Sequence, residues 1–559
     1  MAVGPDEAIA APPAAIFFHP EAYSTDMPRL MGRNAAGESF LKGYLAHARA
    51  LRFFALADDP SHADAFRAAV AGAGRGEAVT VLDKARTGHL AEVGTLFYPG
   101  PDLAVLAERR SLFVDNGWSL SGITHTTSST RAMDAITAMV TGSVQPWDAL
   151  ICTSQAVRAN VEHLLGAETE RMRRRFKAAQ TVLPQLPVIP LGIDTARFAF
   201  TEDARAQARA AIGVAEDAVV VLFVGRLSFH AKAHPLAMYR ALETAAAAEG
   251  KGRPVVLVEC GWFANAHIES AFGEAAAVAC PSVRVVRLDG RSEEARRTAW
   301  GAADIFCSLS DNIQETFGIT PVEAMAAGLP VVVSDWDGYR DTVRDGIDGF
   351  RVPTLMPAGG LGGDLAVRHA LEVDTYDMYC GLAAALVAVD VEATAAAFGR
   401  LIASPDLRRR MGEAGRRRAR EVYDWASLIP RYEALWTELA GIRATAATTR
   451  GAPARPDPFT AFAAYPTRVL EPDTRLALAT GLDRAGAQAR LSADLCLAMV
   501  SYARHVLPPT EDIAAILAQA TPEERPAHDL IAGVPAGRRA QALRALAWMV
   551  KLGALKVVP

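Results

Sequence analysis

Short apolar runs alternate with longer amphipathic stretches through roughly the first 440 residues of this chain. Helical patterns lie between most of these runs, and strands that alternate with helices predict parallel sheets covered on both faces. In the first part of the chain we expect strands at 15–18, 52–57, 78–82, 94–98, 120–124, 149–153 and 188–191. In the second part we expect them at 218–225, 255–259, 283–288, 303–309, 331–335 and 349–352.

The segment ETFGITPVE, residues 315–323, follows one of these predicted strands directly. A helix start is predicted within it, because Thr320 suits the N-cap, Pro321 the first helical position and Glu323 the third. Glu315 would then lie at the carboxyl end of a strand, where open α/β sheets bind ligands, and helix-start amides there favour an anion. A capping box alone would account for Glu323, whereas Glu315 has no helix of its own to cap.

Two cations follow the apolar run AVVVLFVG that opens the second part of the chain. The next residues read RLSFHAKAHP, and Pro235 starts a predicted helix. Arg226 and Lys232 therefore lie in a strand-to-helix loop, where two positive charges would neutralise a departing diphosphate. Ordinary surface charges would explain the two residues equally well.

The first part of the chain offers two weaker candidate sites. The first strand leads into a loop ending GRNAAGESFL, in which Gly32 and Gly37 are predicted to precede a helix. Glycines there let backbone amides approach a phosphate or a sugar, although an ordinary turn is an equal alternative. His125 lies just after a predicted strand and before a helix near Thr130; a lone histidine is more often structural, but this sheet edge favours a ligand.

Four separated segments resemble, in the same order, the retaining glycosyltransferases of family 4, which have the GT-B fold of two Rossmann-like domains facing a cleft. They are DALICTS from Asp148, IPLGIDTARF from Ile189, GRL…K from Gly225, and the glutamate pair Glu315 and Glu323. The resemblance covers residues 14 to about 440. This chain departs from the family pattern at Ala233, where glycine is usual, and at the strand end from Cys307 to Gln314, where a Pro-Ser pair is usual.

The resemblance implies roles for individual residues. Arg226 and Lys232 would hold the donor diphosphate, Glu323 would bind the ribose, and Glu315 and His125 would lie beside the donor sugar. The implied catalytic set is Glu315, Arg226, Lys232 and His125. The implied donor-binding set is Gly32, Gly37, Gly225, Arg226, Lys232, Thr316, Phe317, Gly318, Ile319 and Glu323.

The expected function is transfer of a sugar from a nucleotide-sugar donor to an unknown acceptor with retention of anomeric configuration. The acceptor is a glycan, a lipid-linked glycan, a protein or a small molecule. We expect no cofactor and no metal. The alternatives are a nucleotide-sugar epimerase or a phosphorylase on the same fold, or a non-catalytic nucleotide-binding scaffold.

Composition limits the other classes of function. The net charge of −5 argues against a nucleic-acid binder, and no apolar run approaches the ~20 residues of a membrane span. The six scattered cysteines are typical of small buried residues in a reducing compartment, and the start of the chain is a poor signal peptide. A cytoplasmic protein is therefore expected. The basic stretch ETERMRRRFK, 168–177, is either a solvated helix or a contact with an acidic acceptor or with anionic lipid at the inner face of the membrane.

An α/β protein of several domains is predicted. Residues 1–200 form an acceptor-side Rossmann-like domain, 201–443 a nucleotide-sugar-binding one, 444–458 a linker, and 459–559 a mainly helical module for docking or self-association into a homo-oligomer. The end of that module faintly resembles a winged helix, but it lacks a basic stripe, and DNA binding is not expected. The family pattern lapses over 353–396, which is either a lid over the cleft or a surface insertion.

Overall fold

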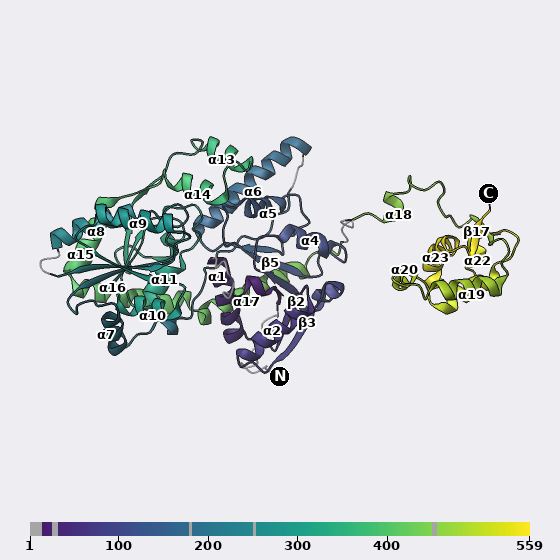
Figure 1. The fold of residues 1–559 in the computed structure, drawn as a ribbon, viewed down its shortest axis with the longest axis horizontal. Helices are drawn as coiled ribbons and strands as arrows, with labels where there is room; N and C mark the ends of the chain where they lie inside the picture. Colours follow the sequence, from purple (N-terminus) through teal and green to yellow (C-terminus); the bar gives the residue numbers. More distant parts are fainter. Residues whose placement is uncertain (1–13, 25–31, 178–180, 250–252, 450–454, 559) are drawn as a thin grey trace. The chain divides into compact units, whose positions relative to one another are not determined.

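The computed structural model describes residues 14–24, 32–177, 181–249, 253–449 and 455–558 (Figure 1). The chain divides into two compact units, residues 1–454 and 455–559. The larger unit contains two six-stranded parallel sheets, one in its N-terminal half (residues 14–200) and one in its C-terminal half (residues 201–449). It has the GT-B fold.

The first sheet has the strand order β3-β2-β1-β4-β5-β6, with all neighbours parallel. Its strands are β1 Ala15–Phe18, β2 Arg52–Ala57, β3 Ala78–Leu82, β4 Thr95–Tyr98, β5 Ser119–Ile123 and β6 Ala149–Ile151. Its helices are α1 Gly32–His47, α2 Pro60–Gly72, α3 Leu90–Val93, α4 Leu103–Ser111, α5 Thr130–Ala138 and α6 Gln155–Phe176.

One predicted strand of this half is wrong. The run 188–191 forms no strand and makes only an isolated bridge between Val188 and Cys152. Pro187 precedes the run and Pro190 lies within it, and a proline has no N–H to donate to a sheet ladder. The chain therefore follows the sheet edge here without extending it.

The second sheet has the order β12-β11-β10-β7-β8-β9, again all parallel. Its strands are β7 Val219–Val224, β8 Val255–Gly261, β9 Arg284–Asp289, β10 Ile305–Ser308, β11 Val331–Ser334 and β12 Gly349–Val352, within two residues of the prediction. Its helices are α7 Glu202–Ala211, α8 Leu236–Glu249, α9 Ala266–Ala279, α10 Glu293–Ala302, α11 Ile319–Ala326, α12 Tyr339–Thr342, α15 Val391–Ala403 and α16 Pro405–Arg418.

Strand β7 shows why its sequence lacks polar alternation. Its six residues are all buried, and helices cover both faces of the sheet (Figure 1). Val220, Leu222 and Val224 pack into one hydrophobic core, whereas Val219, Val221 and Phe223 pack into another. Both sets of side chains leave water, so the hydrophobic effect stabilises a continuous apolar run.

Read from β9, the second sheet has the doubly wound order 3-2-1-4-5-6, and the first sheet has the same order read from β3. The helices that follow β7 and β10 lie on opposite faces of the second sheet. Tyr239 of α8 packs into one core, and Val322 of α11 packs into the other. The connections thus diverge between β7 and β10, and ligands of such sheets bind where the carboxyl ends of the strands meet this divergence.

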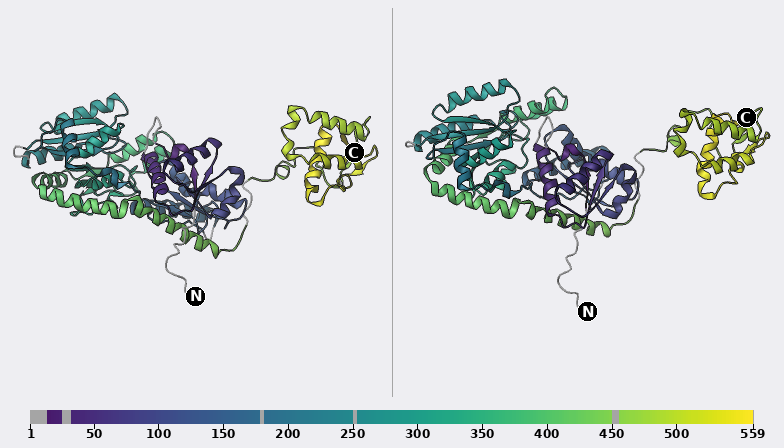
Figure 2. Two further views of the ribbon diagram at one scale, coloured as in Figure 1. Left: turned by 90° about the horizontal axis from the view of Figure 1, so that it is seen from below. Right: turned by 60° about the horizontal axis from the view of Figure 1, so that its bottom comes forward.

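The last helix of the larger unit, α17 Trp425–Ala444, packs against the N-terminal half (Figure 2). Glu433 of this helix pairs with Arg49, at 2.8 Å between Oε2 and Nε. Arg443 donates hydrogen bonds to the Gly94 carbonyl and, at 2.7 Å, to Ser119 Oγ. Helix α17, at the end of the C-terminal half, therefore fixes that half to the first sheet.

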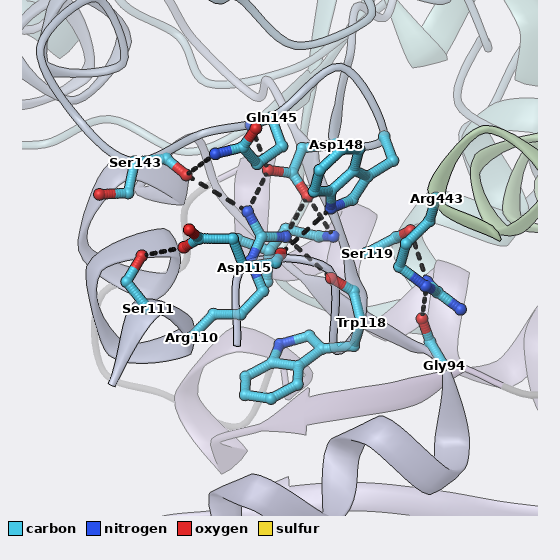
Figure 3. A network of polar contacts seen from close by, with 12 residues as sticks. Gly94, Arg110, Ser111, Asp115, Trp118, Ser119, Ser143, Gln145, Asp148 and Arg443 are labelled. Atoms are coloured by element: carbon cyan, nitrogen blue, oxygen red, sulfur yellow. Dashed lines mark hydrogen bonds and ion pairs between the residues drawn. The ribbon is translucent and has the colours of Figure 1, made fainter. Parts of the chain in front are cut away.

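A buried ion pair joins Arg110 of α4 to Asp148, the residue directly before β6 (Figure 3). Both side chains are fully buried, and Arg110 Nη1 and Nη2 contact the two carboxylate oxygens of Asp148 at 2.6 and 2.8 Å. Asp148 also accepts hydrogen bonds from the amides of Leu120 and Gln145, at 2.8 Å each. Removing one partner would leave an unpaired buried charge, which costs about 3–5 kcal/mol.

Residues 353–389 form a helical insertion beyond the second sheet. Strands β13 Thr354–Leu355 and β14 Ala388–Val389 pair antiparallel at its base, and α13 Gly363–Ala370 and α14 Tyr376–Ala384 lie between them. Tyr376 contacts the N-terminal half, at 3.0 Å between its hydroxyl and Ser128 Oγ. The insertion thus reaches across to the first sheet.

The basic end of α6 contains ion pairs along its own axis. Arg171 contacts Glu168 at 2.6 Å, and Arg174 contacts Glu170 at 3.5 Å. Such pairs are typical of a solvated helix face, and contact with a membrane stays a prediction. No helix in the described ranges has the length and apolar character that crossing a bilayer requires.

The smaller unit has its own hydrophobic core around a three-stranded antiparallel sheet. Its strands are β15 Arg475–Leu478, β16 Arg525–Pro526 and β17 Leu555–Val557, in the order β16-β15-β17. Its helices are α18 Pro458–Ala461, α19 Arg484–Asp494, α20 Ala498–Ser501, α21 Thr510–Gln519, α22 Ala527–Leu530 and α23 Arg539–Lys551. Its one cysteine, Cys496, is exposed, whereas the five cysteines of the larger unit are buried.

Candidate active site

The loops that follow β7 and β10 bring two predicted site residues into contact. Lys232 Nζ lies 2.5 Å from Glu315 Oε2, and both side chains are largely buried. The other oxygen, Glu315 Oε1, accepts hydrogen bonds from the amides of Thr316 at 3.3 Å and Gly318 at 3.1 Å. Residues 83 positions apart in the sequence thus meet where the sheet connections diverge.

The charge of Glu315 is maintained against its burial. Burial alone would raise the pKa of this carboxyl, but the Lys232 ammonium and the amides of Thr316 and Phe317 outweigh it and lower the pKa below its ordinary value. The carboxylate therefore remains ionised at neutral pH. A fixed negative charge here suits a partner that develops positive charge.

Arg226 lies next to this ion pair, because it contacts Gln314, the residue that directly precedes Glu315 in the sequence. Its Nη2 donates to Gln314 Oε1 at 3.0 Å and to the carbonyl of Ala231 at 2.9 Å. Gly225 joins β7 to the arginine. The structure thus brings Arg226, Lys232 and Glu315 to one sheet edge, as the sequence predicted.

Helix α11 begins two residues earlier than predicted, and Thr320 is not its N-cap. The cap is Gly318, which has a φ of 78°, and a Cβ there would lie 1.8 Å from the Tyr339 ring. Only glycine fits both the left-handed backbone and this contact. Glu323 accordingly lies beyond the third helical position, so the capping box does not account for it.

Two carboxyl groups near the site titrate around neutral pH. Burial raises the pKa of Glu323 to about 7, although Arg296, Arg197 and Lys232 lower it in part. Burial likewise raises the pKa of Asp311 to about 7. Perturbed carboxyls in a sheet-edge crevice are typical of functional sites.

The N-terminal half contributes backbone and hydroxyl groups to the same place. Thr316 Oγ1 donates to the His125 carbonyl at 3.2 Å, and Thr153 Oγ1 donates to the Thr316 carbonyl at 3.5 Å. His125 follows β5 at the carboxyl edge of the first sheet, as predicted. The carboxyl edges of both sheets therefore meet around the Glu315 loop.

Three predicted donor-binding residues occupy different settings from those expected. Phe317 is buried, with its ring against Tyr423, so only its backbone faces the site. Gly32 and Gly37 do not precede a helix, because α1 begins at Gly32. A Cβ on Gly37 would lie 2.0 Å from the Ala22 carbonyl oxygen, so close packing explains this glycine. The loop before Gly32 lies outside the described residues.

Sequence reasoning missed Asp337, which follows β11. It has a left-handed backbone, with a φ of 45°, and its Oδ1 accepts a hydrogen bond from Ser154 Oγ at 3.3 Å. Burial and the charge of Glu315 raise its pKa well above the ordinary value. The dipeptide Asp337-Gly338 signals a turn, but nothing in the sequence places that turn beside Glu315.

Gln314 and Tyr376 were also missed, because they meet only in the folded chain. Gln314 Nε2 donates to the Tyr376 hydroxyl at 3.0 Å. No sequence pattern connects the loop after β10 with the insertion. Within the described ranges, no group of three or more His, Cys, Asp or Glu side chains is placed to hold a metal ion.

Comparison with known proteins identifies the segment that carries this site. Residues 204–355 match the family model of the glycosyl transferases group 1. Over this segment the chain is similar to that family. The matched segment includes Arg226, Lys232, Glu315 and Glu323.

Curated relatives match over limited lengths. D-inositol 3-phosphate glycosyltransferase of Geodermatophilus obscurus is 36% identical over 180 residues, which are 31% of this chain and 37% of the relative. Phosphatidyl-myo-inositol mannosyltransferase of Mycobacterium leprae is 46% identical over 79 residues, 14% of this chain and 20% of the relative. The chain spans less than half the length of the curated relatives that it matches.

A solved structure resembles the fold over a longer stretch. Anabaena HepE, solved in complex with UDP, aligns with a TM-score of 0.50 and 15% sequence identity. The alignment covers 76% of this chain and 100% of the Anabaena chain. This likeness shows the shared GT-B architecture.

Proposed function

We propose that this protein transfers a glycosyl group from a nucleotide-sugar donor to an acceptor with retention of anomeric configuration. The observation that carries the proposal is the convergence of Lys232, Glu315 and Arg226 at the carboxyl edge of the second sheet. Two cations and one ionised carboxylate at one point suit a reaction that separates a negative leaving group from a positive sugar.

Lys232 and Arg226 would take up the negative charge of the leaving diphosphate. The Lys232 ammonium has three donors, and one of them already serves Glu315, so the others remain for phosphate oxygens. Helix α11 begins at Ile319, shortly after Glu315, and a helix N-terminus favours an anion.

Glu315 would act on the sugar. Its carboxylate is held by the lysine and by two backbone amides, so it needs no reorganisation when the anomeric carbon gains positive charge. A preorganised charge of this kind stabilises the transition state more than the bound substrate. Glu323, which is partly protonated near neutral pH, would hydrogen-bond the ribose hydroxyls.

The donor and the acceptor can be sought together. The protein would be incubated with UDP-, GDP- and ADP-sugars, with inositol 3-phosphate or phosphatidylinositol as the first acceptors, because related proteins carry the names of inositol-phosphate and phosphatidyl-myo-inositol enzymes. Release of the nucleoside diphosphate would be followed, and NMR would give the anomeric configuration of the product.

Acceptor-dependent release with a retained anomer is the expected result. An inverted product would overturn the retaining mechanism. Donor cleavage without transfer to any acceptor would favour the epimerase or phosphorylase alternative, and nucleotide binding without turnover would favour a scaffold.

A further inference from the structure

Helix α14 of the insertion packs against the loop that carries the two cations. A Cβ on Gly381 would lie 2.8 Å from His230 Cβ and 3.1 Å from the His230 carbonyl oxygen. His230 lies between Arg226 and Lys232 in the sequence, and its carbonyl accepts a hydrogen bond from Asn312 Nδ2 at 2.9 Å. The insertion is therefore a wall of the candidate active site.

Tyr376, the first residue of α14, lies at the centre of a hydrogen-bond chain. Its hydroxyl lies 3.0 Å from Gln314 Nε2, 3.0 Å from Ser128 Oγ and 3.3 Å from Thr126 Oγ1. Gln314 continues the chain through its Oε1 to Arg226 at 3.0 Å. A single hydroxyl of the insertion thus connects the N-terminal half with the arginine.

We propose that Tyr376 is a positioning residue that orients Arg226 for the donor diphosphate through the side-chain amide of Gln314. The inference rests on the proposed function, in which Arg226 binds that diphosphate. The insertion is then part of the active site, contributed by a segment in which the family pattern lapses.

The direction of each hydrogen bond gives the physical reason. The Tyr376 hydroxyl accepts from Gln314 Nε2, so the amide must present its oxygen to Arg226. Without the hydroxyl, the amide loses the contact that fixes its NH₂ group, so its oxygen is held less firmly in front of the guanidinium. The tyrosine hydroxyl can meanwhile donate to Ser128 or Thr126, so the arrangement is complete only when the two halves are together.

The decisive variant is Tyr376→Phe, which removes the hydroxyl and keeps the ring. Binding of UDP, GDP and ADP to the full-length protein would be measured by calorimetry, together with the melting temperature. We expect about tenfold weaker binding of the preferred nucleotide with an unchanged melting temperature, since one weakened hydrogen bond to a charged group costs about that much.

Tyr379→Phe provides the matched control on the same helix. The Tyr379 ring stacks on the His369 imidazole at 4.2 Å between centroids, away from Gln314. This variant is expected to bind nucleotide like the unmodified protein. Equal affinities of Tyr376→Phe and Tyr379→Phe would overturn the proposal.

A double variant tests the route through the amide. If Tyr376 acts through Gln314, Tyr376→Phe in a Gln314→Ala background should weaken binding no further, whereas additive losses would overturn the route. Arg226→Ala tests the proposed function separately. If it binds all three nucleotides as the unmodified protein does, the diphosphate role of Arg226 fails; if only the tyrosine variant is unaffected, the positioning role fails alone.

Discussion

The two sheets of the larger unit have the same strand order but different chemistry at their carboxyl edges. In the second sheet, Lys232 and Glu315 form an ion pair where the connections diverge, and Arg226 adjoins it. In the first sheet, the described turn after β1 packs on itself, with the Tyr23 ring stacked on Phe18. The shared strand order thus gives each sheet a possible binding position at its carboxyl edge, and the charged side chains make the second sheet the one that suits an anion.

The first sheet contributes neutral groups to the shared site instead. The His125 carbonyl accepts a hydrogen bond from the Thr316 hydroxyl, and the Thr153 hydroxyl donates one to the Thr316 carbonyl. The Ser128 hydroxyl contacts the Tyr376 hydroxyl. Such groups suit a hydroxyl-bearing acceptor better than a diphosphate. Charge would therefore matter at the second edge, and shape and hydrogen bonding at the first.

The largest effect is expected from the cations of the second edge. Arg226→Ala and Lys232→Ala should each lower kcat by about 10² or more, because each removes a positive charge that the proposed function assigns to the leaving diphosphate. Initial rates of nucleoside diphosphate release would measure this. Lys42→Ala, on an exposed lysine of α1, is the matched control and should retain the full rate. Near-normal rates in both cation variants would contradict the idea that the charged residues at the carboxyl edge of the second sheet distinguish it from the first sheet.

Glu315→Gln is expected to lower kcat by about 10² while donor affinity changes only a few-fold. The neutral amide keeps the shape but loses the charge that the sugar needs as it becomes positive, which is the signature of a transition-state interaction. Steady-state kinetics and equilibrium nucleotide binding would separate the two quantities. An unchanged kcat would move the chemistry toward the first edge, where His125 is the next residue to replace.

Glu323→Gln is expected to weaken nucleotide binding about tenfold and to change the pH dependence of stability. The folded pKa of about 7 lies above the ordinary value of 4.5, so the folded state binds more protons between these pH values. Stability therefore falls as pH rises from about 4.5 to 7 and is level above that.

The glutamine variant loses this cost, which is on the order of 3 kcal/mol for a shift of this size. It should equal the unmodified protein at pH 4 and exceed it at pH 8. Urea unfolding at the two pH values would measure the difference. A variant that is less stable at pH 8, with normal nucleotide affinity, would contradict both expectations.

The smallest effect on binding is expected at the first edge. Gly37→Ala places a Cβ against the Ala22 carbonyl, so α1 must shift, at a cost of about 1–3 kcal/mol of stability. Nucleotide affinity of the folded protein should stay unchanged. Calorimetric binding and urea unfolding would check both results. Lost affinity at unchanged stability would instead assign Gly37 to the donor site and weaken the contrast between the two sheets.

The sequence by itself determined the sheets and the charged loops. Continuous apolar runs such as β7 must be buried on both faces, and alternation with helices makes the sheets parallel. The carboxyl edge then follows, and it places Arg226, Lys232 and Glu315 on one side of the second sheet. Two predictions from local sequence were wrong. The apolar run 188–191 forms no strand, because prolines prevent pairing, and Gly37 lies inside a helix and not before one.

Tertiary structure decided which side chains meet. Thr320 looked like an N-cap, but the contact of Gly318 with Tyr339 and its left-handed backbone start α11 earlier. The Lys232–Glu315 pair and the chain from Ser128 through Tyr376 to Arg226 join residues from distant segments. Hydrophobic periodicity carries information about burial one element at a time, whereas an ion pair or a relay of hydrogen bonds depends on how loops of different elements approach one another.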